Sequence, residues 1–373
     1  MQSRLKLARI SLMRIGVYDP YLDTLGGGEK YMLTAASCLS QKHEVSVFWD
    51  QKDILLSGQN KFDIDLSRVN LVPDIFTTDT SIIRKILDTR RFDAILFLSD
   101  GSLPFVSSDL YVHFQFPVEW VNAKGLIQSQ KIKRIKKIIC NSNFTKSYID
   151  KKFNKDSIVL HPPTYLEEKM PKVNFDKKQN IILNVGRYAT FPNKVSVKKQ
   201  EFMIDAFKRM CDLGLRDYQF HLVISYLNVD KEKVKNLYKR IGKYPIKILE
   251  NASYKDLSRE YALSKIYWHA AGVNEDLDKF PEKAEHFGIT TVEAEINGLV
   301  PVVFDAGGQK EIVKEGESGY LWTSDIEFIE KTFVVTRNAS LLRKMSDKAV
   351  ISGHKFSTNL FSQKILNIFD NEN

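Results

Sequence analysis

Short apolar runs alternate with longer amphipathic stretches along the whole chain, and this alternation constrains the fold more than any other feature. Runs such as Ala94–Leu98 and Val300–Phe304 have the length and composition of buried strands, whereas Lys231–Ile241 has helical spacing. Alternation of this kind is typical of α/β layers with mostly parallel sheets. We therefore expect an α/β fold throughout.

The same patterns predict individual elements. We expect strands over residues 15–18, 44–49, 94–98, 110–115, 137–140, 181–185, 221–224, 246–249, 266–268 and 300–304. We expect helices over residues 29–40, 143–151, 199–212, 231–241, 254–262, 290–296 and 358–369.

The chain has room for two domains. Its 373 residues and 43% hydrophobic content permit two full cores. A polar, proline-containing stretch over residues 162–180 has the composition of an interdomain linker. We expect an N-terminal domain over 1–165, a C-terminal domain over 166–355 and a final segment over 356–373. The first twelve residues are basic and lack the long apolar core of a secretory signal.

Net charge, cysteine content and apolar runs bear on the possible partners and the cellular compartment of the protein. The formal net charge of +9 is compatible with nucleic acid, an anionic membrane surface or an anionic small substrate, and does not choose among them. The three cysteines (Cys38, Cys140 and Cys211) are scattered and have no metal-ligand spacing, which indicates thiols in a reducing compartment. No apolar run approaches the roughly 20 residues of a membrane span.

One stretch of the sequence, residues 285–293, has the features of a ligand-binding site. Glu285 and Glu293 bracket seven residues, and Gly288 predicts that a helix begins near Ile289. The first carboxylate would then lie in front of the helix, and the free N–H groups of residues 289–291 would point between the two carboxylates. A helix N-terminus favours anions and phosphate above all. Such a site suits a sugar nucleotide, with carboxylates for hydroxyls and N–H groups for the diphosphate.

The segment 285–294 followed by 298–303 resembles the E-x7-E signature of family 4 retaining glycosyltransferases, which have the GT-B fold. Further segments resemble family motifs in the family's order: 25–30, 140–145, 161–163, 184–187 with Lys198, and 203–207. The resemblance implies two Rossmann-like domains with mostly parallel sheets facing a central cleft. It also implies that the final helix returns to the N-terminal domain.

The resemblance assigns roles to particular residues. Glu285 would contact hydroxyls of the donor sugar, and Glu293 would hold the ribose hydroxyls. Arg187 and Lys198 would meet the phosphates, where negative charge grows in the transition state. Donor contacts would also come from the segment Phe287, Gly288, Ile289 and Thr290. We read Glu295 as solvated and without a role.

The N-terminal half supplies fewer candidates. Gly27 and Gly28 follow the first strand and would let the backbone approach the donor phosphate, although this loop matches neither a P-loop nor G-x-G-x-x-G. His113 falls where the family often places a catalytic histidine near the transferred sugar; a structural role is the alternative. Asp19 is a weaker candidate after the first strand.

Cofactor, partner and location follow from the same resemblance. Two D-x-D triplets (63–65 and 276–278) are best explained by chance, and we expect no obligatory metal or other cofactor. The expected activity moves a hexose from GDP-mannose or a UDP-hexose to a hydroxyl of a glycan, lipid-linked or small-molecule acceptor, in cell-surface glycan or glycolipid synthesis. The expected location is the cytoplasm or the inner face of the cell membrane. The basic segment 131–137 is either an ordinary helix or a contact for anionic lipid.

Two alternatives stay open at this point. A sugar-nucleotide epimerase on the same fold would turn over the donor without an acceptor. A non-catalytic nucleic-acid-binding protein would explain the positive charge, but no recognised nucleic-acid-binding motif supports it.

Overall fold

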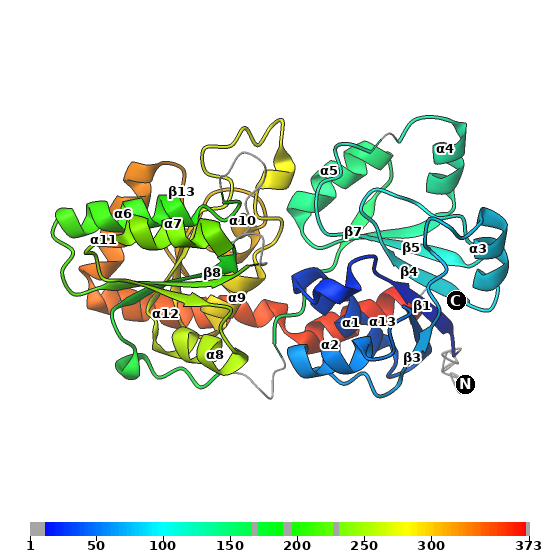
Figure 1. Ribbon diagram of the computed structural model, residues 1–373, viewed down its shortest axis with the longest axis horizontal. Coiled ribbons are helices and arrows are strands. Elements are labelled where there is room, and N and C mark those ends of the chain that lie inside the picture. Colours follow the sequence, from blue (N-terminus) through cyan, green and yellow to red (C-terminus); the bar gives the residue numbers. More distant parts are fainter. Residues whose placement is uncertain (1–11, 122, 166–170, 189–195, 227–230, 371–373) are drawn as a thin grey trace, which may run out of the picture. The chain divides into compact units, whose positions relative to one another are not determined.

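The computed structural model describes residues 12–121, 123–165, 171–188, 196–226 and 231–370. Contacts within the chain define two compact units (Figure 1). Unit 1 comprises Met1–Pro163 together with Thr358–Asn373, and unit 2 comprises Thr164–Ser357. The first boundary, between residues 163 and 164, lies close to the expected one at 165. The expected linker lies partly outside the described residues, as do residues 1–11.

Unit 1 is built on a seven-stranded sheet in the order β3-β2-β1-β4-β5-β6-β7, and every pair of neighbours is parallel. The first strand in the chain, β1, lies inside the sheet, and the later strands are added first on one side of it and then on the other. The strands are β1 (Arg14–Tyr18), β2 (Glu44–Phe48), β3 (Val69–Val72), β4 (Ala94–Leu98), β5 (Asp109–Phe114), β6 (Ile135–Cys140) and β7 (Ser157–Val159).

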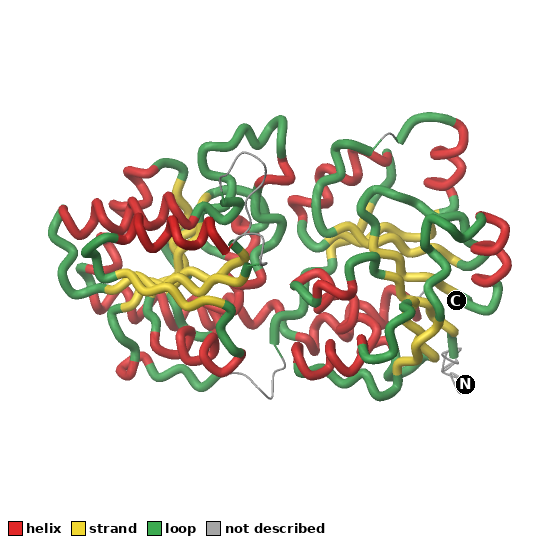
Figure 2. Tube along the Cα trace, in the orientation of Figure 1, coloured by secondary structure: helices red, strands yellow, loops and turns green. Residues whose placement is uncertain are grey.

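Helices cover both faces of this sheet (Figures 1 and 2). The core on one face contains residues of α1 and of the C-terminal helix α13, where Phe361 meets Tyr31 edge to face at 5.1 Å. The core on the other face includes Ile149 and Phe153 of α5. The helices are α1 (Gly27–Leu39), α2 (Ile54–Phe62), α3 (Ile82–Thr89), α4 (Leu126–Lys133), α5 (Asn143–Phe153) and α13 (Thr358–Asp370).

Unit 2 repeats this plan with six parallel strands in the order β10-β9-β8-β11-β12-β13. Its first strand, β8, again lies inside the sheet, between β9 and β11. The strands are β8 (Ile181–Arg187), β9 (Gln219–Ser225), β10 (Ile246–Glu250), β11 (Ile266–His269), β12 (Val300–Phe304) and β13 (Tyr320–Trp322).

The unit 2 sheet also has a core on each face. One core is formed with residues of α6, α7, α11 and α12, around Trp268 and Trp322. The other is formed with residues of α8 and α9, around Tyr267 and Phe287. The helices are α6 (Gln200–Asp212), α7 (Lys231–Ile241), α8 (Tyr254–Leu263), α9 (Ile289–Ile296), α10 (Gln309–Ile312), α11 (Asp325–Thr336) and α12 (Ala339–Gly353).

The two parallel sheets flanked by helices confirm the predicted α/β class, and every strand and helix predicted from the sequence is present. Three short strands (β3, β7 and β13) and the helices α2, α3, α10, α11 and α12 were not predicted. The short strands have three or four residues each, too few to show a period. The basic segment is part helix and part strand, since α4 ends at Lys133 and β6 begins at Ile135. Within the described residues, no helix combines the length and apolar character needed to cross a membrane.

Candidate functional site

The candidate site lies where the direction of strand addition reverses in unit 2. Parallel strands end at the same edge of a sheet, and a crevice forms where neighbouring crossovers leave in opposite directions. In unit 2 this point is between β8 and β11. β8 ends at Arg187 and β11 ends at His269, and the segment carrying Glu285 follows β11 in the chain. The predicted residues therefore gather at the edge where open α/β sheets bind ligands.

Glu285 is the centre of the site. Its Oε2 is 2.5 Å from the Lys198 ammonium and 2.7 Å from Nε2 of His269. The carboxylate side chain is 14% exposed. Burial by itself would raise the pKa of Glu285, but the Lys198 charge and the His269 hydrogen bond outweigh burial and hold that pKa well below its ordinary range. Glu285 is therefore a fixed, ionised hydrogen-bond acceptor at neutral pH.

Two glycines after β12 fix the backbone of Glu285. The N–H of Gly308 donates to the Glu285 carbonyl at 2.8 Å. A Cβ atom on Gly307 would lie 2.0 Å from that carbonyl oxygen, and one on Gly308 would lie 2.4 Å from the Cα of Phe287. No side chain fits at either position without moving the Glu285 segment. This Gly-Gly pair thus positions the carboxylate.

Helix α9 begins at Ile289, as predicted, because Gly288 has φ 115°. Of the three N–H groups expected to face a ligand, that of Thr291 bonds to the Gly288 carbonyl at 3.0 Å. The expectation was therefore wrong for Thr291. Helical geometry leaves the N–H groups of Ile289 and Thr290 without a carbonyl partner in the helix. These two groups can accept an anion in front of α9.

Glu293 lies one turn into α9. Its carboxylate accepts a hydrogen bond from the Tyr261 hydroxyl at 3.0 Å. The Tyr267 hydroxyl bonds to the Thr290 side chain at 2.7 Å. Burial raises the pKa of both tyrosines above their ordinary value, so both hydroxyls stay protonated. The two tyrosines hold Glu293 and the first turn of α9 in place.

Arg187 emerges at the end of β8, as predicted, and its side chain is exposed. Its guanidinium forms no ion pair with any residue in the described part of the chain. Its carbonyl accepts a hydrogen bond from Gln200 at 3.4 Å. Much of the loop that follows Arg187, residues 189–195, lies outside the described residues.

The structure places the Phe287 side chain in the core and overturns the expectation for Glu295. Phe287, proposed as a donor contact, is 2% exposed and packs edge to face on Phe356 at 5.2 Å, so its side chain belongs to the core. Glu295, read as solvated, is fully buried and its Oε1 accepts a hydrogen bond from Ser318 at 3.1 Å. Burial raises the pKa of Glu295 well above its ordinary value, which favours the protonated carboxyl. Its position on the inward face of α9 explains the error.

His113, a candidate from unit 1, lies in the core of that unit. His113 is fully buried in β5, stacks on Tyr31 at 4.0 Å, and its Nδ1 is 3.1 Å from the Ile139 carbonyl. Burial lowers the pKa of His113 to about 3, so the imidazole is neutral. The structure gives the His113 side chain a place in the core and no exposed atom for a sugar. We therefore leave it out of the proposed donor site.

Gly27 is the first residue of α1, as its position after β1 suggested. A Cβ atom on Gly28 would lie 2.3 Å from Oε1 of Gln115, and the Gln115 amide donates to the Gly28 carbonyl at 3.1 Å. Gly28 therefore admits the side chain of Gln115 beside α1. This contact lies within unit 1.

His269 was missed in the sequence. It has no motif of its own, and the apolar run before it reads as an ordinary buried strand. The only available signal was its position directly after that run, at the edge where strand ends gather.

The described residues contain no group of three or more His, Cys, Asp or Glu side chains that could hold a metal ion.

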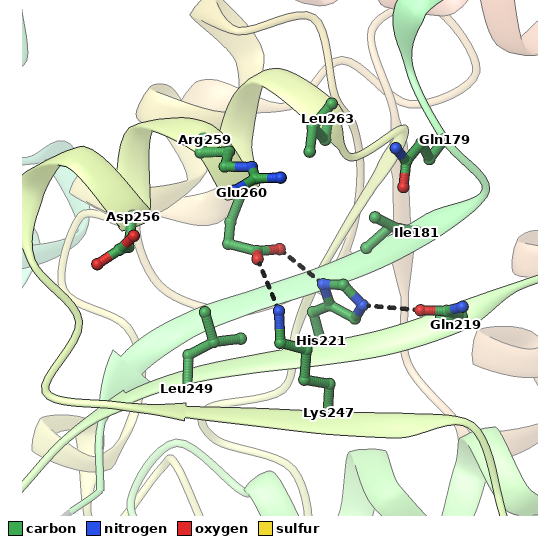
Figure 3. A pocket seen from close by; sticks show the side chains of 10 residues that line it. All are labelled: Gln179, Ile181, Gln219, His221, Lys247, Leu249, Asp256, Arg259, Glu260 and Leu263. Atoms are coloured by element: carbon green, nitrogen blue, oxygen red, sulfur yellow. Dashed lines mark hydrogen bonds and ion pairs between the residues drawn. The ribbon is translucent and has the colours of Figure 1, made fainter.

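A polar pocket of about 320 Å³ also lies in unit 2, between α8 and the strands β8, β9 and β10 (Figure 3). Within it, His221 Nδ1 is 2.6 Å from Glu260 Oε2, and Lys247 reaches the other oxygen at 3.5 Å. Burial would raise the pKa of Glu260, but the His221 and Lys247 contacts lower it overall. His221 and Glu260 bond to each other, and neither residue belongs to the Glu285 cluster.

Comparison with known proteins shows what this chain is similar to. Residues 166–349 match the model of glycosyl transferases group 1. The chain is 22% identical over 452 residues to a Dictyostelium discoideum GDP-Man:Man(3)GlcNAc(2)-PP-Dol alpha-1,2-mannosyltransferase, covering 96% of this chain and 84% of that protein. It is 26% identical over 260 residues to the alpha-1,3/1,6-mannosyltransferase ALG2 of the same organism, covering 61% of this chain and 59% of that protein.

Solved structures agree on the fold. A glycosyltransferase from Rickettsia africae superimposes with a TM-score of 0.71 at 16% identity, over 97% of this chain and 98% of that one. Anabaena HepE, in complex with UDP and glucose, superimposes with a TM-score of 0.68 at 15% identity, over 96% of this chain and 100% of that one. The fold is thus the two-domain α/β fold of GT-B glycosyltransferases, and residues 166–349, 184 of the 373, are similar to glycosyl transferases group 1.

Proposed function

We propose that this protein moves a hexose from a nucleotide-diphospho-sugar to a hydroxyl group of an acceptor, with retention at the anomeric carbon. The observation that carries the proposal is the Glu285 carboxylate, held ionised by Lys198 and His269 in front of helix α9. A fixed acceptor beside the free N–H groups of a helix matches the two ends of a sugar nucleotide.

In this proposal the donor lies along the edge between β8 and α9. Glu285 accepts hydrogen bonds from the sugar hydroxyls and Glu293 from those of the ribose. The N–H groups of Ile289 and Thr290 and the exposed Arg187 meet the diphosphate. An ammonium has three donors, so Lys198 can bind a phosphate oxygen while it keeps its contact with Glu285.

The transfer step needs no group beyond these and the two substrates. The acceptor oxygen forms a bond to the anomeric carbon on the face from which the diphosphate leaves. The acceptor proton passes to the departing phosphate oxygen. Arg187 and Lys198 stabilise the charge that grows on the diphosphate, which is the task a metal ion would otherwise serve. We therefore propose a metal-independent, retaining reaction, and an inverted product would rule out this course.

Two donor classes are proposed. GDP-mannose is favoured by the relative whose name specifies GDP-Man and by the second mannosyltransferase relative. A UDP-hexose is favoured by the likeness to HepE, whose structure holds UDP and glucose. The proposed acceptor is a glycan, a lipid-linked glycan or a small molecule in cell-surface glycan or glycolipid synthesis. We propose action in the cytoplasm, at the inner face of the membrane.

A thermal-shift panel of GDP- and UDP-sugars on the wild type and on Glu293→Ala tests the donor site. A ligand that binds only the folded protein raises its stability by mass action. We expect one nucleotide class to raise the Tm of the wild type and to lose this effect in Glu293→Ala. Glu315→Ala, a change outside the proposed site, is the control and should keep the response. A panel with no shift for any sugar nucleotide would contradict the proposal.

Incubation of the stabilising donor with candidate acceptors then tests the reaction. The anomeric configuration of the product, read by NMR, separates retention from inversion. The same assay in the presence of EDTA tests metal independence. Conversion of the donor sugar to its epimer without an acceptor would favour the epimerase alternative.

A further inference from the structure

Two strongly basic segments lie in unit 1, whose formal net charge is +5, against +4 for unit 2. Residues 123–137 contain six basic and no acidic side chains, and residues 82–91 contain four basic and one acidic. Together they carry a formal charge of +9, which equals the formal net charge of the whole chain. The rest of unit 1 carries a net charge of −4, so the positive charge of unit 1 is local to these two segments. The basic residues of the two segments lie on helices α3 and α4 and next to their ends.

These two helices are neighbours in unit 1 (Figure 1). The segment 105–108 joins them: the Val106 carbonyl accepts a hydrogen bond from Arg134 after α4 at 2.9 Å, and the Ser107 N–H donates to Thr89 of α3 at 3.1 Å. Lys131 of α4 lies over the Phe105 ring at 5.0 Å. Burial, and then the charge of Lys85 on α3, lower the pKa of Lys131. The basic groups of α3 and α4 thus lie close enough to interact.

The same two helices expose large apolar side chains. Ile82, Ile83 and Leu87 of α3 are 57%, 71% and 51% exposed. Leu126 and Ile127, in the first turn of α4, are 86% and 65% exposed. Ile83 and Leu87 are four residues apart and share one face of α3. We call these five side chains the α3–α4 apolar set.

Apolar side chains inside a cationic field match a particular kind of surface. Basic residues attract the anionic headgroups of a bilayer, and exposed Ile and Leu side chains enter the boundary between headgroups and acyl chains. Neither feature alone identifies a membrane-binding surface, because single surface apolar residues are common and positive charge by itself also attracts nucleic acid. Their coincidence on adjacent helices favours a lipid surface.

We propose that the α3–α4 apolar set, with the basic residues around it, docks unit 1 on an anionic membrane. This names a surface for the membrane contact in the proposed function and rests on it for its purpose, although its observations are independent of the donor site. Docking of this kind would hold the enzyme where a lipid-linked acceptor is presented.

Sedimentation of the full chain with lipid vesicles tests the proposal. We expect binding to vesicles of phosphatidylcholine mixed with phosphatidylglycerol, no binding to phosphatidylcholine alone, and loss of binding in high salt. Ile83→Ser combined with Leu87→Ser should lower the vesicle partition coefficient about tenfold, because two inserting side chains are removed. Lys133→Gln should weaken binding in low salt and have little effect in high salt.

The matched control is Ile326→Ser combined with Ile351→Ser in unit 2, at positions 55% and 61% exposed on α11 and α12. This control should bind vesicles as the wild type does. Equal loss in both double variants, or no wild-type binding to anionic vesicles, would overturn the proposal. So would a concentration-dependent dimer that only the Ile83/Leu87 variant abolishes, since the surface would then join two copies.

The docking surface and the proposed transferase activity can be contradicted independently of each other. The Tm rise caused by a sugar nucleotide should be unchanged in the Ile83/Leu87 variant, because neither side chain belongs to unit 2. Vesicle binding with no response to any sugar nucleotide would leave the docking surface standing and remove the transferase. A nucleotide response without vesicle binding would do the reverse.

Discussion

The imidazole of His269 donates a hydrogen bond from Nε2 to the carboxylate of Glu285 at 2.7 Å. The carboxylate can only accept, so the proton of the neutral ring must lie on Nε2. Burial lowers the pKa of His269 more strongly than Glu285 raises it, and the ring stays uncharged. His269 is thus a positioning residue, buried at the end of β11, that orients the carboxylate through one hydrogen bond.

Replacement of His269 by leucine should impair transfer and leave the fold intact. A hydrogen bond to a charged group contributes about 1.5–3 kcal/mol, so kcat/KM should fall roughly ten- to hundredfold. His269→Gln, whose amide N–H can take the place of Nε2, should recover most of this loss. The measurement is steady-state transfer with the donor identified by thermal shift.

His221→Leu is the matched control for His269→Leu. His221 is also a buried histidine bonded to a glutamate, on β9 of the same sheet. Its loss should lower the Tm and leave kcat/KM within about twofold of the wild type, because it does not touch Glu285. Wild-type kcat/KM in His269→Leu would refute the positioning role.

Replacement of Lys198 by methionine should shift the acid limb of the pH–rate profile. Lys198 is one of two groups that hold the pKa of Glu285 below its ordinary value against burial. Without this cation, burial dominates and the pKa of Glu285 rises, so activity should be lost at a higher pH as the solution is acidified. The quantity to measure is kcat/KM as a function of pH.

Lys199→Met separates this effect from a general loss of positive charge. Lys199 is the next residue but pairs with Glu275. Its acid limb should coincide with that of the wild type. An unshifted acid limb in Lys198→Met would show that Glu285 does not titrate with activity.

Asp19 should make the protein less stable as pH rises from about 4 to 7. This carboxyl, directly after β1, is 1% exposed, and burial raises its pKa from the ordinary value of an aspartate to about 7. The folded state therefore holds a proton that the unfolded chain releases within this window. Stability is fully present below the unfolded pKa and is lost as pH rises through the folded one.

Asp19→Asn removes the titration and keeps an oxygen for the Tyr21 N–H, which Asp19 binds at 2.9 Å. We expect the variant to be more stable than the wild type at pH 7 by at most about 3–4 kcal/mol, and close to it at pH 4. Denaturant unfolding at both values of pH measures the difference. Asp23→Asn, at an exposed carboxyl nearby, should leave the pH dependence of the wild type. A variant with the wild-type slope would contradict the assignment to Asp19.

Glu295 should behave as a neutral, buried hydrogen-bonding group. Glu295→Gln keeps the shape and the bond from Ser318, and should change the free energy of unfolding by less than about 1 kcal/mol. Glu295→Ala leaves a cavity and an unmatched hydroxyl and should cost about 2–4 kcal/mol. Denaturant unfolding at pH 7 measures both. Equal destabilisation by Gln and Ala would show that the carboxyl is charged in the fold.

Much of this protein was determined by the sequence itself. Apolar runs such as Ala94–Leu98 and Val300–Phe304 predicted strands with those bounds, because a buried parallel strand needs a short continuous apolar segment. Gly288 predicted where α9 begins, because a positive φ there is almost closed to other residues. These signals are local, so no tertiary contact was required to read them.

Only the tertiary structure decided which side chains meet. Lys198 is 87 residues and His269 is 16 residues from Glu285 in the chain, and the parallel pairing of β8, β11 and β12 brings all three to one edge. Burial of Glu295 and His113 was likewise set by the elements packed against them. A residue type has the same appearance in a sequence whether its side chain faces water or the core, and its charge is decided by burial together with the charges and hydrogen bonds around it.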